Sequence, residues 1–135
     1  MNDWVRYLIA AVVAAHGIVY LNAARGVLPV FEGWKGRSWL LGSAVTGDPL
    51  RKLCLGLWAL AGVGLIASGV ALAFSVPAVW RPLAIAASVV GILGFLAFWD
   101  GRPERLLAQG AIGLVLSAAI LAAAIWLPTG LPGGR

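Results

Sequence analysis

The chain has 135 residues, of which 61% are hydrophobic and 11% charged, and its mean hydropathy is +0.95. A soluble domain carries about 45–50% apolar and about 25% charged residues, so this composition excludes an ordinary water-soluble fold. The formal net charge of +5 is scattered over loops and chain ends, with no basic stripe on any predicted helix, which excludes a nucleic-acid-binding surface.

Charged residues divide the chain into apolar stretches that are long enough to cross a bilayer. A hydrocarbon core about 30 Å thick needs roughly 20 apolar residues in a helix. We therefore predict a single transmembrane domain over residues 1–135, an all-α integral membrane four-helix bundle with antiparallel up-and-down topology. The predicted spans are residues 4–24, 51–75, 82–99 and 106–127.

The first predicted span contains the only histidine of the chain, His16, near the expected middle of the bilayer. Ionisable groups at that depth are rare and are candidates for function. Tyr20 follows one turn later on the same helix face, so His16 and Tyr20 are the candidate ligand-binding residues. Three interpretations stay open for His16: a packing residue bonded across the bundle to Ser68, Ser88 or Ser117; a ligand, quinone or proton-relay site; and haem or metal ligation. A bis-histidine haem would need its second histidine from another chain.

A long connection over residues 25–52 follows the first span and is predicted to lie partly in the membrane interface. Trp34 and Trp39 would then sit at headgroup depth. The second helix is expected to start with Asp48 as its N-cap and Pro49 as its first helical residue.

The two later connections are predicted to be short. Trp80-Arg81-Pro82 is expected to separate the second and third spans, because proline disfavours helix continuation. The segment 100–105 is expected to be a solvated, charge-mixed turn before the fourth span. Gln109, early in the fourth span, is a candidate bridging polar group.

Small residues at helical spacing predict close packing between the spans, because lipid tails leave little hydrophobic drive for helices to associate. The candidate helix-packing residues are Gly17, Gly62, Gly64, Ser68, Gly69, Ala87, Gly91, Gly113 and Ser117. The same pattern would also serve dimerisation, and the sequence leaves the two open.

Positive charges and tryptophans predict the orientation. The side richer in Lys and Arg is usually cytoplasmic. The loop side holds Arg25, Lys35, Arg37, Arg51, Lys52, Arg102 and Arg105, against Arg6, Arg81 and Arg135 on the side of the termini. We therefore expect a multi-pass protein of the inner (plasma) membrane, with both termini on the outer, periplasmic side. The candidate interfacial anchors are Trp4, Trp34, Trp39, Trp80, Trp99 and Trp126, whereas Trp58 lies deeper in its span.

Several membrane functions lack the residues that they need. A proton-coupled multidrug exporter needs an intramembrane carboxylate, and none of the predicted spans has one. A thiol–disulfide relay needs two cysteines, and Cys54 is the only one. The sequence contains neither a P-loop nor a zinc constellation. We predict no catalytic residue and no metal site.

The segment Ala15-His16-Gly17, the Trp- and Gly-containing loop after it, and Trp99 before the last turn resemble the DoxX-like group of four-helix bacterial membrane proteins. The resemblance implies a compact four-helix bundle. It also implies membrane subunits associated with quinone-linked sulfur oxidation or with oxidative-stress complexes. Only His16 and Gly17 can be carried over, and no mechanism comes with them.

Three functions remain open at this point. The first is an accessory or structural subunit, not an enzyme, whose partners are lipid and other membrane subunits or further copies of itself. The second is a DoxX-like redox- or quinone-associated protein in which His16 and Tyr20 lie near the ligand; a quinone is the only cofactor considered. The third is a small-molecule carrier or channel, which would need a polar path past His16.

Overall fold

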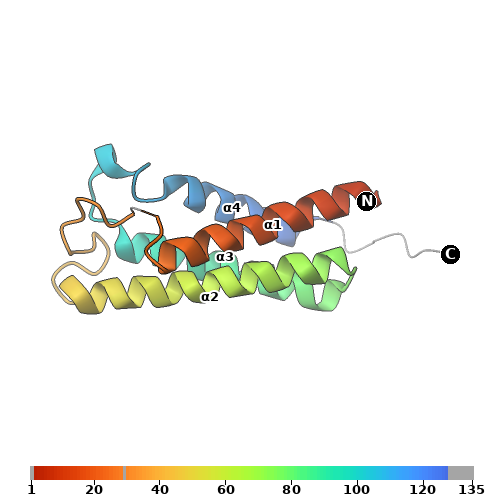
Figure 1. Ribbon diagram of the computed structural model, residues 1–135, viewed down its shortest axis with the longest axis horizontal. Coiled ribbons are helices and arrows are strands. Elements are labelled where there is room, and N and C mark those ends of the chain that lie inside the picture. The colour runs from red at the N-terminus through yellow and green to blue at the C-terminus, as the bar shows by residue number, and fades with distance from the viewer. Residues whose placement is uncertain (1, 29, 128–135) are drawn as a thin grey trace.

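The computed structural model describes residues 2–28 and 30–127, and the described chain is helical throughout its regular structure (Figure 1). The helices are α1 (Asp3–Ala24), α2 (Gly47–Ala73), α3 (Pro77–Phe98), the short 3₁₀ helix η1 (Pro103–Arg105) and α4 (Ala111–Trp126). The prediction of an all-α chain is confirmed. Arg135, which enters the predicted charge count, lies outside the described residues.

Three of the described helices, α1, α2 and α3, are long and apolar enough to cross a membrane. Helix α4 is the most apolar of the four α-helices but has 16 residues, which corresponds to a length of about 24 Å. These helices indicate a membrane protein. Consecutive helices pack against one another in chain order, whereas α1 and α4 touch only sparsely.

The fourth helix begins at Ala111, later than the predicted residue 106. Residues 106–110 form turns instead, and Gly110 before the helix has φ 104°. A backbone at this positive φ cannot continue a right-handed helix, and glycine adopts it without steric cost. The predicted fourth span therefore includes a turn that hydropathy alone does not reveal.

The predicted break at Trp80-Arg81-Pro82 is wrong, because α3 begins at Pro77 and contains Pro82. The chain reverses earlier, at Ser75, which has φ 58°. The Ser75 amide donates to the carbonyl of Leu72, and the next amide donates to the carbonyl of Ala71, which is the hydrogen-bond pattern of a Schellman cap. Helix α2 is thus ended by a turn that usually contains glycine.

The start of α2 also differs from the prediction. The helix begins at Gly47 with Thr46 as the N-cap residue, so Asp48 lies inside the first turn. The carboxylate of Asp48 forms an ion pair with Lys52, one turn later, at 2.8 Å. An acidic side chain in the first turn and its partner at i+4 both favour the helix.

Helices α1 and α2 are in backbone contact where glycine occupies both sides. A methyl group built on Gly17 would lie 2.6 Å from the carbonyl oxygen of Gly62, and one built on Gly62 would lie 2.8 Å from the carbonyl oxygen of Gly17. Two turns away, a methyl group on Gly69 would lie 2.7 Å from the carbonyl oxygen of Ala10. Only residues without a side chain allow this approach.

Helices α2 and α3 meet through similarly small residues. A methyl group on Gly64 would lie 2.8 Å from the Cβ of Ala87. Nearby, the hydroxyl of Ser68 donates to the carbonyl of Trp80 at 2.8 Å. Trp80 is only 6% exposed, so it is a core residue rather than an interfacial anchor. Its position follows from the early start of α3, which carries Trp80 into the helix.

The long connection after α1 is bound to the segment between α3 and α4. The indole Nε1 of Trp34 donates to the carbonyl of Phe98 at 2.9 Å, and the amide of Trp39 donates to the carbonyl of Trp99 at 2.7 Å. Arg102 donates to the carbonyl of Gly33 at 2.7 Å. These bonds join the two connections into one cap over that end of the helices.

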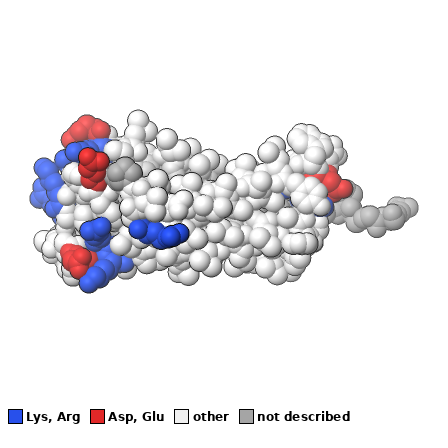
Figure 2. Space-filling view, viewed as in Figure 1, with Lys and Arg blue, Asp and Glu red and all other residues white. Residues whose placement is uncertain are grey.

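Most of the Lys and Arg side chains in view gather at this capped end (Figure 2). Among the predicted anchors, Trp4, Trp39 and Trp126 are exposed, whereas Trp34 and Trp99 are half-buried in the cap.

Candidate functional site

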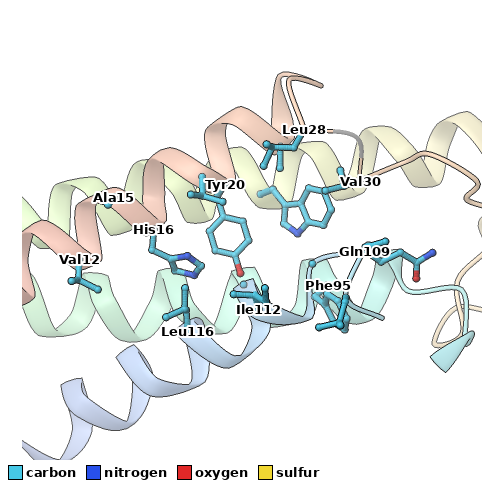
Figure 3. A pocket seen from close by; sticks show the side chains of 17 residues that line it. Val12, Ala15, His16, Tyr20, Leu28, Val30, Phe95, Gln109, Ile112 and Leu116 are labelled. Carbon is cyan, nitrogen blue, oxygen red and sulfur yellow. The ribbon is translucent and has the colours of Figure 1, made fainter. Parts of the chain in front are cut away.

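The two candidate ligand-binding residues meet a third polar residue between α1 and α4. Nε2 of His16 lies 3.0 Å from the hydroxyl oxygen of Ser117, and the hydroxyl of Tyr20 lies 2.8 Å from the same oxygen. The His16 and Tyr20 rings pack against each other with their planes inclined by 54° and their centroids 4.8 Å apart. Figure 3 shows both rings projecting from α1 toward α4. We call His16, Tyr20 and Ser117 the polar trio.

Glycines on α3 and α4 leave the space that the polar trio occupies. A methyl group on Gly91 would lie 2.6 Å from the hydroxyl oxygen of Tyr20. Gly113 lies one turn before Ser117, and a methyl group there would be 3.7 Å from Cε1 of His16. Both glycines belong to the predicted packing residues, and the structure brings them to the side chains of α1.

Beside the polar trio, a groove of about 530 Å³ lies between α1 and α4. Its walls are mostly apolar, and Val12, Val19, Ile112 and Leu116 at its edge are exposed. The groove exists because α1 and α4 barely touch. Because these exposed side chains lie along both helices, the groove opens at the side of the molecule between α1 and α4.

Two buried nitrogens at the groove have no hydrogen-bond partner among the described residues. One is Nδ1 of His16, whose residue is 4% exposed, and the other is Nε1 of Trp58, whose residue is 3% exposed. The indole nitrogen can only donate, whereas the imidazole nitrogen donates or accepts according to its tautomer. Leaving a buried polar group unpaired costs about 1–3 kcal/mol, so both nitrogens call for a partner.

Gln109 lies at the capped end of the groove and is 1% exposed. Its amide points away from His16 and Tyr20 in Figure 3. It lies close to the carboxylate of Asp100 but forms no well-directed hydrogen bond with it. Asp100 is a nearby candidate partner for Gln109, as the backbone of Gly113 is for His16, so Trp58 is the clearest candidate ligand contact of the three.

The carboxylate of Asp100 is fully buried, which corrects the expectation of a solvated turn at this residue. Nε and Nη2 of Arg102 both donate to its Oδ2. Burial acts to raise the pKa of Asp100, but the hydrogen bonds and charge of Arg102 and the nearby Gln109 amide outweigh it, so the pKa lies below its ordinary value. Asp100 is therefore ionised at neutral pH.

A row of aromatic rings connects the groove with the cap. Trp58 lies 6.5 Å from Tyr20 and 5.2 Å from Phe98, and Phe98 lies 4.6 Å from Phe31 and 5.2 Å from Trp34, measured between ring centroids. Sequence reasoning missed Trp58 and Phe98 as site residues. The only signal for Trp58 was its depth within a span, away from both predicted aromatic belts.

The described residues contain no group of three or more His, Cys, Asp and Glu side chains that could hold a metal ion. Cys54, on α2, is fully buried.

No protein-family model matches the chain, and neither does any curated protein or solved structure. The resemblance to DoxX-like proteins therefore stays a prediction.

Proposed function

We propose that this protein crosses the membrane several times and binds a small lipid-soluble ligand with an oxygen-bearing head group in the groove between α1 and α4. One observation carries the proposal: His16 and Trp58, which line an apolar groove of about 530 Å³, each hold a buried nitrogen without a hydrogen-bond partner among the described residues. Small-molecule sites commonly measure about 300–1,000 Å³, with apolar walls and a few polar groups that orient the ligand.

In the proposed membrane arrangement the four helices form an antiparallel bundle with both termini outside. The gathering of Lys and Arg at the capped end supports a cytoplasmic cap, by the positive-inside rule. The polar trio would then lie within the hydrocarbon layer. A ligand would enter sideways from the lipid, past the exposed edge formed by Val12, Val19, Ile112 and Leu116.

The chemistry of the two nitrogens limits the ligand. Trp58 Nε1 needs an acceptor, and carbonyl or hydroxyl oxygens are the acceptors that lipid-soluble molecules commonly carry. The rest of the ligand must be apolar, because the walls of the groove are. A quinone with an alkyl tail meets both conditions, in agreement with the quinone-associated alternative from the sequence.

The other two functions stay predictions. A partner subunit would cover the exposed apolar faces of the helices no better than lipid does, so these faces do not favour an accessory role. A carrier or channel needs a path between the two sides of the membrane, whereas the groove opens sideways.

Binding of decylubiquinone, a benzoquinone with an alkyl tail, tests the proposal. The full chain in lipid nanodiscs is compared with empty nanodiscs of the same lipid, and the bound quinone is measured by equilibrium partition. Trp58→Phe keeps the ring packing but removes the donor, and should weaken binding about five-fold, the equivalent of one hydrogen bond. His16→Ala should weaken it at least as much.

Ser88→Ala is the matched control, because Ser88 is buried and without a partner among the described residues but does not line the groove. It should bind decylubiquinone as the wild type does. Binding no greater than that of empty nanodiscs, or equal binding by wild type, Trp58→Phe and His16→Ala, would contradict the proposal.

A further inference from the structure

The segment from Gly36 to Gly47 forms a closed loop at the capped end of the helices. The amide of Gly47 donates to the carbonyl of Gly36 at 2.6 Å, which fixes the base of the loop. Ser38 is buried, and its hydroxyl oxygen accepts from the amides of the second and third residues after it, both at 3.0 Å. The turn is therefore held from inside, and Trp39 and Leu40 at its tip stay 60% and 52% exposed.

A cleft of about 510 Å³ lies against this loop, at a distance along the chain from the groove residues. Its lining is polar and consists of Arg37, Ser38, Gly42, Ser43, Thr46 and Asp100. Arg37, Ser43 and Thr46 are exposed residues, so a guanidinium and two hydroxyls are within reach of a ligand. Thr46 is the N-cap residue of α2, but its hydroxyl makes no capping bond. The cleft therefore holds hydrogen-bond donors that the helix does not use.

The uncompensated charge at this cleft is positive. Asp100 lines it too, but its side chain has no exposed surface and its Oδ2 accepts from Arg102, so these two charges balance each other. Arg37 has no ion pair among the described residues, and neither has Lys35, two positions before it. Asp48, close by in the sequence, is paired within α2. An anion thus meets a guanidinium and hydroxyl donors together, which are groups that bind phosphate oxygens well.

We propose that this cleft binds the phosphate head group of an anionic phospholipid. The guanidinium of Arg37 pairs with the phosphate, and the hydroxyls of Ser43 and Thr46 donate to its other oxygens. The exposed tip, Trp39 and Leu40, contacts the acyl chains beside the head group, a depth at which tryptophan is favoured. A soluble phosphate ester would leave this apolar tip in water, so the tip favours a lipid.

The gathering of Lys and Arg at the capped end supports the choice of an anionic lipid (Figure 2). Each basic side chain near an anionic membrane surface contributes about 1 kcal/mol to its attraction. The inference concerns the cap and goes beyond the proposed function, because it uses no residue of the groove between α1 and α4.

Native mass spectrometry of the full chain in a neutral detergent tests the inference. The probes are palmitoyl-oleoyl phosphatidylglycerol and the matching phosphatidylcholine, which share their acyl chains and phosphate and differ in net charge. The wild type should bind phosphatidylglycerol about five-fold more tightly than phosphatidylcholine. Arg37→Gln should reduce this preference to below about two-fold. Ser43→Ala removes one hydroxyl without changing the charge, and should weaken binding of phosphatidylglycerol about two-fold.

Arg25→Gln is the matched control. Arg25 is exposed and has no ion pair among the described residues, but it lies at the end of α1 and does not line the cleft. The variant should keep the wild-type preference. If Arg25→Gln and Arg37→Gln lower the preference equally, the attraction belongs to the whole charged end, and the cleft is not a site. Equal binding of both lipids by the wild type would also overturn the inference.

A water-soluble competitor distinguishes a lipid from a free phosphate ester. sn-Glycerol 3-phosphate at millimolar concentration should leave phosphatidylglycerol bound, because it lacks the acyl chains that the tip contacts. Its displacement of the lipid would overturn the assignment to a phospholipid. The test is separate from that of the groove: a chain that prefers phosphatidylglycerol but does not bind decylubiquinone would keep this inference and lose the proposed function, and the reverse result would do the opposite.

Discussion

Helix α1 has two neighbours, and its two sides are built in opposite ways. Toward α2, Gly17 meets Gly62 so closely that neither position has space for a methyl group. Toward α4, the helices stand apart, and the space between them holds the rings of His16 and Tyr20 and an apolar groove. Glycine makes room in both places. Toward α2 it admits a neighbouring backbone, and beside the polar trio it admits the side chains of Tyr20 and His16.

The difference suits the proposed function, in which firm packing on one side of a helix accompanies a binding site on the other. Van der Waals packing between backbones provides most of what holds helices together in lipid. On the α1–α2 side this packing is complete. On the α1–α4 side it is replaced by hydrogen bonds through Ser117, which leave neighbouring space for a ligand. In the proposed function, the tight side stabilises the protein and the open side binds the ligand.

The largest effect should come from closing the space at the tight side. Gly17→Ala places a methyl group against the carbonyl oxygen of Gly62, a backbone atom that cannot turn away. We expect a loss of about 3 kcal/mol in the free energy of unfolding. Titration with sodium dodecyl sulfate, followed by far-ultraviolet circular dichroism, measures it. Gly56→Ala is the control, because nothing lies within 4 Å of its added methyl group. If both variants lose stability equally, the two sides do not differ as described.

The second effect concerns the hydroxyl of Ser117, which joins α4 to α1 on the open side. Ser117→Ala leaves Tyr20 and Nε2 of His16 without their common partner, and should lower the free energy of unfolding by about 2 kcal/mol. Ser88→Ala removes a buried hydroxyl that has no partner among the described residues, so it should leave stability unchanged or slightly higher. The same denaturant titration compares the two serines. A larger loss for Ser88→Ala would mean that the polar trio does not hold α4 to α1.

The third effect is on the space for the Tyr20 ring. Gly91→Ala would bring a methyl group within 2.6 Å of the Tyr20 hydroxyl oxygen, so the ring must tilt away from Ser117. Because a side chain yields more easily than a backbone, we expect a loss of about 1.5 kcal/mol. Gly113→Ala, with its nearest contact at 3.7 Å, should change stability little. In a Tyr20→Leu background, which removes the hydroxyl and also the ring atoms Cζ and Cε2 at 2.8 and 3.1 Å, the penalty of Gly91→Ala should shrink; an unchanged penalty would show that the strain lies elsewhere.

The smallest effect is on the cap. The pKa of Asp100 is lower in the folded protein than its ordinary value of 3.8, so its ion pair with Arg102 stabilises the cap at neutral pH. That stabilisation is present above the ordinary pKa and is lost as the pH falls through the lower, folded pKa. Acidification to this range should lower the protection of the Trp39 amide, which donates to Trp99, when its hydrogen exchange is compared with the intrinsic exchange rate at each pH. The effect should be small, because Arg102 is partly exposed and water screens the pair.

In the Asp100→Asn variant, the Trp39 amide should exchange faster at neutral pH than in the wild type, and its protection should no longer change with pH in this range. Asp48→Asn is the matched control, since Asp48 pairs with Lys52 on the exposed start of α2 and does not contact the cap. An Asp100→Asn variant with the wild-type pH profile would show that the Asp100–Arg102 pair does not stabilise the cap.

The features that could be predicted from the sequence depend on neighbours along the chain. Apolar runs indicated the long apolar helices, and a lone histidine within one of them indicated the place of the candidate site. The ends of helices were harder to predict. Pro82 lies inside α3, and the break occurs at Ser75, a residue type that rarely adopts the positive φ found there. A proline near the start of a helix removes few hydrogen bonds, so its presence alone did not locate the boundary.

The sequence by itself determined that this chain forms apolar helices, because helix formation and transfer into lipid depend on local composition. Only the tertiary structure decided that His16 is bonded to Ser117 rather than to Ser68 or Ser88, and that Trp58 is one of the residues lining the groove. Hydropathy cannot decide this, because a helix that is apolar all round carries no stripe to show which face turns inward. That rotation is set by close contacts such as the one between Gly17 and Gly62, and these join residues far apart in the chain.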